Sequence, residues 1–257
     1  MRSPQLTMIA ILTVGLTASS IFGRAAQTSV GSQDAQIQAD VLKALNKKQF
    51  QDVKVTSQNG VVTLSGTVAL YADKQDADNK THRRKNVKGV DNEIVVAGPA
   101  VDDATLRDEL MKKISYDRAG YGTLPFNAFT VDVQSGVVTL GGVAYGPTDK
   151  GSALSLAAYY PGVKDVIDNI DVAPVSRMDD RIRIAALRSI YGATPLNKYF
   201  LNPAKPIRIT VVNGNIVLSG VVDSESDKTV AGLRANSVPG GFKVVNNLQV
   251  QKSAPKK

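Results

Sequence analysis

A stretch of sixteen residues occurs three times in this chain, and no other feature restricts its possible folds as strongly. The copies are VKVTSQNGVVTLSGTV (53–68), FTVDVQSGVVTLGGVA (129–144) and IRITVVNGNIVLSGVV (207–222), and they align without a gap at offsets of 76 and 78 residues. The same offsets align the segments 85–96, 161–172 and 239–250. Three copies in a fixed register predict three equivalent structural units in place of one large domain.

Each copy carries the pattern of a β-hairpin, because apolar and polar residues alternate on both sides of a two-residue turn. The turn pairs favour the positive φ angles of tight hairpins, and they are Asn59-Gly60, Ser135-Gly136 and Asn213-Gly214. A further glycine ends the second strand of each copy, where a missing side chain permits a bend or a close backbone approach. The expected turn and bend glycines are Gly60, Gly66, Gly136, Gly142, Gly214 and Gly220.

A helix is predicted on each side of the hairpin. Aspartates precede the first helix of each copy and are expected to open it: Asp34, then Asp102 and Asp103, then Asp179 and Asp180. The second helix has small residues on one face and ends at a left-handed stop position, which is Asn86, Gly162 or Gly240. A short third strand closes each copy at Val96, Val172 or Val250.

These elements predict an α+β protein of three tandem α-β-β-α-β domains, which we call unit 1 (34–96), unit 2 (102–172) and unit 3 (179–250). Each unit should have a three-stranded mixed sheet with two helices on one face, because the crossover from the second to the third strand is expected to be right-handed.

The order of elements, the hairpin pattern turn-Gly-Val-x-Leu-x-Gly, the Asp-Lys pair opening the second helix and the ending PGVKDVIDNIDV (161–172) resemble the BON domain of bacterial envelope proteins. The resemblance implies export to the periplasm or outer envelope, a stress-related role, attachment to phospholipid surfaces, and no catalytic residues. Unit 1 lacks the Pro-Gly pair, and unit 3 has Gly241 and Phe242 where a Val-polar pair is usual. Equal function of the three units is therefore not expected.

Residues 1–25 have the pattern of a signal peptide, which predicts a periplasmic protein. The apolar run 6–18 is shorter than the roughly 20 residues that span a bilayer as a helix. Cleavage is expected after Ala25 or after Ser20; the alternatives are a disordered tail and an uncleaved weak anchor. Residues 251–257 are expected to form a flexible tail.

A run of basic residues in unit 1 is the best candidate for a binding site. This basic cluster, expected on the second helix, consists of Lys80, Arg83, Arg84, Lys85 and Lys88. Arg84 occupies the position of Tyr160 in unit 2 and Val238 in unit 3, so unit 1 has charge where the others have apolar contact. The cluster fits an anionic membrane surface, and a solvated helix face is the alternative. Nucleic acid is not expected, since no aromatic residue interleaves with the charges.

The charge of the whole chain also favours anionic partners. The formal net charge is +8, and removal of residues 1–25, which contain two arginines and no acid, leaves +6. The second hypothesis is a scaffold that binds other envelope proteins through sheet edges or aromatic loops. The loops 115–128 and 191–206 hold six aromatic residues: Tyr116, Tyr121, Phe126, Tyr191, Tyr199 and Phe200. Lids over the unit's own sheet and packing between units are the structural alternatives.

An enzyme is not expected. The chain has no cysteine, and its one histidine, His82, lies within the basic run. Histidine or cysteine metal sites therefore lack ligands, and no cofactor is predicted. The pattern gives no basis for predicting self-association.

Overall fold

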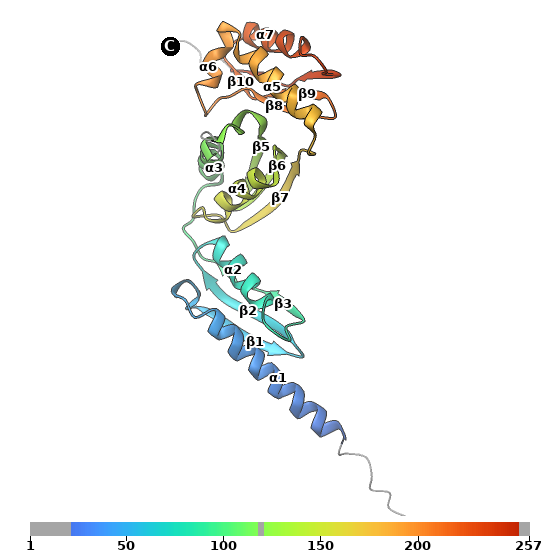
Figure 1. The fold of residues 1–257 in the computed structure, drawn as a ribbon. Coiled ribbons are helices and arrows are strands. Elements are labelled where there is room, and N and C mark those ends of the chain that lie inside the picture. The colour runs from blue at the N-terminus through green and yellow to red at the C-terminus, as the bar shows by residue number, and fades with distance from the viewer. Residues whose placement is uncertain (1–21, 118–120, 252–257) are drawn as a thin grey trace, which may run out of the picture.

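The computed structural model describes residues 22–117 and 121–251, which form three α/β units in a row (Figure 1). Unit 1 contains α1 (Phe22–Ala44), η1 (Lys48–Phe50), β1 (Val53–Gln58), β2 (Val61–Val68), α2 (Tyr71–His82), β3 (Gly89–Asn92) and β4 (Val95–Val96). Unit 2 contains α3 (Asp103–Asp117), η3 (Leu124–Phe126), β5 (Ala128–Gln134), β6 (Val137–Ala144), α4 (Pro147–Ala158) and β7 (Asp165–Val172).

Unit 3 contains α5 (Arg177–Tyr191), η4 (Thr194–Leu196), α6 (Asn197–Phe200), β8 (Arg208–Val212), β9 (Asn215–Ser219), β10 (Val221–Val222), α7 (Glu225–Asn236), β11 (Lys243–Asn246) and β12 (Gln249–Val250). The predicted α+β class and the three-unit organisation are confirmed.

The second strand is the central strand of every sheet. It pairs antiparallel with the first strand of its unit and parallel with the last, as in the order β5-β6-β7. The last strand is continuous in unit 2 but split in units 1 and 3, where β4 pairs with β2 and β12 pairs with β10. In each unit a helix therefore connects the central strand to a parallel last strand.

The core of each unit lies between the sheet and its two helices. Apolar residues at every second position of the central strand are fully buried, for example Val138 and Leu140 in β6. The helices contribute residues at helical spacing, such as Leu106 and Leu110 in α3. The small residue Ala153 in α4 is buried in the same cluster, which lets that helix lie close to the sheet.

The first helices do not begin where the aspartates predicted. Helix α1 begins at Phe22, so Asp34 does not open it. Helix α5 begins at Arg177, and the hydroxyl of Ser176 accepts a hydrogen bond from the backbone N–H of Asp179 at 3.2 Å. Only in unit 2 is the expectation met, since Asp102 accepts a hydrogen bond from the N–H of Thr105 and α3 begins at Asp103.

The turn aspartates (Asp34, Asp103 and Asp179) hold the hairpin turn in each unit. Asp34 accepts hydrogen bonds from the N–H groups of Asn59 at 2.8 Å and Gly60 at 2.9 Å. Asp103 in unit 2 and Asp179 in unit 3 accept hydrogen bonds from the N–H groups at the equivalent two turn positions. The N–H of Gly60 also keeps the pKa of Asp34 below its usual value, because its hydrogen bond favours the carboxylate.

Units 2 and 3 share part of their interior. Phe126 of η3 belongs to the buried core of unit 3, where its ring centroid lies 5.6 Å from that of Tyr145. The hydroxyl of Tyr145 donates to Asp180, and the guanidinium of Arg183 lies 5.2 Å from the Tyr145 ring centroid. Side chains of unit 2 thus complete the core of unit 3.

Candidate anionic-surface site

The sequence pattern suggested that the basic cluster lies on one helix, but in the structure it does not. Helix α2 ends at His82, so that Lys80 is helical, Arg83 is the C-terminal cap, and Arg84, Lys85 and Lys88 lie in the connection to β3. Asn86, within this connection, has a φ angle of 65°. The chain therefore leaves the helix early and carries the charges around the end of the unit.

Two of the five side chains in the cluster are engaged within the unit. The ammonium of Lys80 forms an ion pair with Asp76 and lies 5.9 Å from the ring centroid of Phe50. The Nε of half-buried Arg84 donates to the carbonyl of Lys80 at 3.1 Å. The remaining members, Arg83, Lys85 and Lys88, are exposed, so they carry the charge that a partner could reach.

The cluster lies at the hairpin-turn end of unit 1. The backbone N–H of Lys88 donates to the carbonyl of Gly60 at 2.8 Å, and the aliphatic stem of Lys88 covers that turn glycine. Helix α1 passes the same end, because Asp34 binds the turn, and its N-terminal part extends beyond the hairpin (Figure 1). Charge and projecting helix are thus at one end of the molecule.

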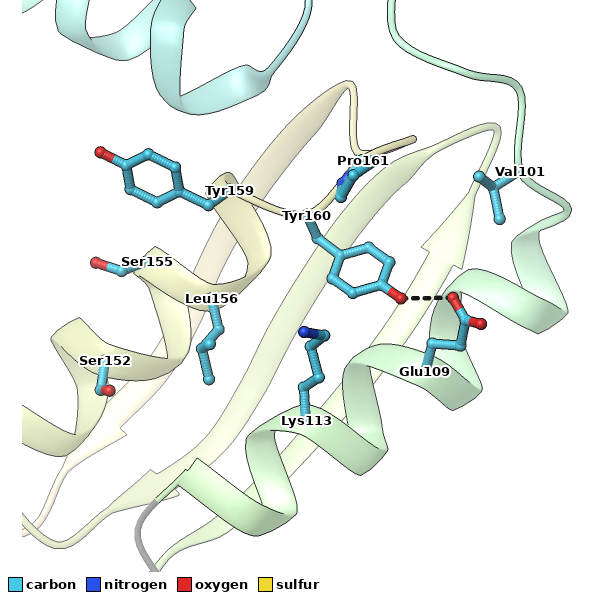
Figure 2. Close-up of a pocket in the computed structure, with 9 residues that line it drawn as sticks. All are labelled: Val101, Glu109, Lys113, Ser152, Ser155, Leu156, Tyr159, Tyr160 and Pro161. Carbon is cyan, nitrogen blue, oxygen red and sulfur yellow. Dashed lines mark hydrogen bonds between the residues drawn. The ribbon is translucent and has the colours of Figure 1, made fainter.

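The equivalent end of unit 2 is aromatic. Tyr159 and Tyr160 stand where unit 1 has Arg83 and Arg84, and they border a groove of about 510 Å³ between α3 and α4 (Figure 2). The hydroxyl of Tyr160 donates to Glu109 at 2.5 Å, which raises the pKa of this tyrosine. Lys113 lies 5.5 Å from the Tyr160 ring centroid. Tyr160 is therefore engaged by contacts within unit 2, while Tyr159 is exposed.

In unit 3 the corresponding positions are Ser237 and Val238, so unit 1 has arginines at two positions where the other two units have none. His82 lies at 3.5 Å from Asp78, measured from Nε2 to Oδ2. Within residues 22–117 and 121–251, no three His, Asp or Glu side chains are arranged to hold a metal ion. No helix in the same ranges is long and apolar enough to cross a membrane.

One aromatic loop packs on its own unit and the other packs between units. In unit 3 the loop packs on its own unit: buried Tyr191 donates its hydroxyl to the carbonyl of Ile207 at 2.7 Å, and Tyr199 donates to Asp227 at 2.7 Å. In unit 2 the loop instead packs on the next unit through Phe126. Tyr116, Tyr121 and Phe200 remain exposed.

Sequence reasoning missed the buried aspartates that hold these loops. Asp149 accepts hydrogen bonds from the hydroxyl of Thr123 at 2.7 Å and the amide of Asn127 at 3.0 Å. Asp227 accepts from Tyr199, as above, and lies 3.0 Å from the ammonium of Lys198. Both aspartates belong to the repeated Asp-Lys pair at the second helix. Their position in the repeat, in units that also have a long loop, was the signal that could have indicated this role.

Comparison with known proteins identifies one family. The model of the BON domain matches residues 33–98, 102–174 and 183–252. A search of curated proteins finds no match. Two solved structures of CdsD, a structural protein of the type III secretion system of Chlamydia trachomatis, are similar to this chain.

One of these structures, the CdsD C-terminal domain, is 18% identical, with 83% of this chain and 96% of that chain covered and a TM-score of 0.23. The other is 17% identical, with 84% and 92% covered and the same TM-score. Superposition this weak carries no argument about function or assembly.

Proposed function

The chain belongs to the BON domain family, and from this premise we propose that it is an exported, non-enzymatic envelope protein that attaches to anionic phospholipid surfaces through the basic cluster of unit 1. The family is envelope-associated and of a phospholipid-binding type. The single observation that supports this site is the placement of Arg83, Lys85 and Lys88, which are exposed together at the free hairpin-turn end.

The expected strength of attachment follows from the number of exposed charges. Each basic residue near an anionic bilayer contributes about 1 kcal/mol, and this attraction is screened over a Debye length of about 8 Å at physiological salt. Three such residues together supply about 3 kcal/mol, which is roughly a hundredfold in affinity. Attachment should therefore be reversible and sensitive to salt.

Co-sedimentation with vesicles tests the proposal. The exported protein should bind vesicles rich in phosphatidylglycerol at low salt and bind them more weakly at physiological salt. It should not bind phosphatidylcholine vesicles. The variant Arg83→Gln/Lys85→Gln/Lys88→Gln should lose most of this binding, by up to about a hundredfold.

The matched control removes the same charge from exposed positions of units 2 and 3, as Lys112→Gln/Arg181→Gln/Arg234→Gln. Equal losses in both variants would mean that net charge alone drives attachment, which contradicts a site on unit 1. No binding at low salt would reject the membrane proposal and leave protein partners in the envelope as the function to test.

The proposed export predicts a shortened N-terminus. Mass spectrometry of the protein recovered from a periplasmic fraction should find an N-terminus at Ala26 or Ile21, since signal peptidases cleave after small residues. Cleavage after Ala25 would remove the first four residues of α1 and leave Asp34 and the turn contacts in place. An intact Met1 would contradict the predicted cleavage.

A further inference from the structure

A cleft of about 660 Å³ lies between units 2 and 3. Unit 2 contributes Met111 from α3 and Phe129 from β5, and unit 3 contributes Pro206 and Val221. These side chains give the cleft an apolar wall on each side. Its volume lies in the range of about 300–1,000 Å³ that is usual for sites of small organic ligands.

The cleft also holds a half-buried guanidinium. Arg208, the first residue of β8, lines it and donates one hydrogen bond, from Nη1 to the carbonyl of Leu124 in η3. Burial lowers the pKa of Arg208 to about 10, so that the side chain is still charged at neutral pH. In the parts of the chain that the structure describes, no ion pair joins Arg208 to a carboxylate.

The remaining N–H groups of Arg208 are available to a ligand. A guanidinium has five N–H donors, and one of them is used by Leu124. No fully buried side-chain nitrogen or oxygen among the described residues lacks a hydrogen-bond partner. The nitrogens Nε and Nη2 of Arg208 are therefore not fully buried, and Arg208 lines the cleft.

The charge around the cleft favours an anion. Lys205 is the second basic residue of the lining, and no aspartate or glutamate is part of it. An ion that replaces water at a half-buried guanidinium interacts more strongly than at an exposed side chain, because the surroundings are less polar. The fork of an arginine also matches the two oxygens of a carboxylate.

We propose that this inter-unit cleft binds a small organic carboxylate with an apolar body. The carboxylate pairs with Arg208, and the apolar body lies along Met111 and Phe129. This site is distinct from the basic cluster of unit 1. It binds a single dissolved molecule, whereas the basic cluster contacts a membrane surface.

Titration calorimetry with monomeric dodecanoate tests the proposal on the full exported protein. Dodecanoate should bind with a defined stoichiometry of one, and dodecyltrimethylammonium, which has the same chain and the opposite charge, should bind at least tenfold more weakly. Arg208→Gln should weaken dodecanoate binding at least tenfold. Lys54→Gln should leave it unchanged, because Lys54 is the exposed residue at the same strand position of unit 1.

A second variant covers the case in which Arg208→Gln disturbs the packing between units. Met111 is 37% exposed, so Met111→Glu can be accommodated and places a negative charge beside the apolar body of the ligand. It should also weaken dodecanoate binding at least tenfold, with an unchanged circular dichroism spectrum. Binding that survives in Met111→Glu, equal binding of the two alkyl probes, or no binding of dodecanoate would each overturn the proposal.

The outcome does not depend on membrane attachment. The variant Arg83→Gln/Lys85→Gln/Lys88→Gln should bind dodecanoate like the unaltered protein, and Met111→Glu should bind phosphatidylglycerol vesicles like the unaltered protein. The two proposals can therefore fail separately.

Discussion

Gly142→Ala is expected to destabilise unit 2 by about 3 kcal/mol or more, the largest effect of a single methyl group in this unit. Gly142 has a φ angle of 91°, a region that residues with a side chain rarely adopt. Its added Cβ would also collide with the backbone carbonyl oxygen of Ala128, which belongs to the neighbouring strand β5. Because backbone meets backbone, the collision can be relieved only by moving one strand of the sheet.

The matched control is Gly151→Ala in helix α4 of the same unit. No atom lies within 4 Å of the position that its Cβ would take, and the residue is exposed. Alanine should therefore stabilise the helix by about 0.5–1 kcal/mol. Urea unfolding followed by hydrogen exchange in β5 and β6 measures both variants, and a Gly142→Ala protein as stable as the unaltered one would show that the strand bend is not required.

Asp179→Ala should cost unit 3 about 2–4 kcal/mol, since it leaves two backbone N–H groups without their acceptor. Asp179 is 1% exposed and accepts hydrogen bonds from Asn213 at 3.0 Å and Gly214 at 2.8 Å. Water cannot easily replace a carboxylate that is this deeply buried. Hydrogen exchange at the amides of Asn213 and Gly214 should accelerate together with the loss of global stability.

The same substitution in unit 1 provides the comparison. Asp34 makes equivalent bonds to Asn59 and Gly60, but its carboxylate is only half-buried, so water can more easily take its place. Asp34→Ala should therefore be clearly milder than Asp179→Ala. Because the pKa of Asp34 is lowered in the folded state, its contribution is complete at neutral pH and is lost as the pH falls below the usual carboxyl range. Equal costs for the two substitutions would show that burial of the aspartate is not what sets the effect.

Local patterns were sufficient to predict the repeated fold. The alternation around Val138 and Leu140 and the turn pair Ser135-Gly136 describe interactions between near neighbours in the chain, which is why the hairpins follow from the sequence. The role of the turn aspartates was missed because their partners lie some 25 to 35 residues away, as in the bond from Gly60 to Asp34. A helix-start preference and a long-range hydrogen bond can use the same residue type.

The candidate sites were likewise predictable only as far as they depend on near neighbours in the chain. The basic cluster was visible in the composition of 80–88, but its distribution around the end of unit 1 depends on where α2 ends. Arg208 drew no attention in the sequence, since it occupies a strand position that is exposed lysine in unit 1, at Lys54. It becomes half-buried because η3 of unit 2 lies on β8, and no pattern within unit 3 contains that information.

The shared interior of units 2 and 3 bears on how such a protein could change by gain or loss of repeats. Phe126 belongs to the chain of unit 2 but to the hydrophobic core of unit 3. A deletion of unit 2 from the gene would therefore open a hole in the unit that remains, at a cost of several kcal/mol for a missing aromatic side chain. Gain or loss of a copy should therefore be less costly where the last two copies are kept together.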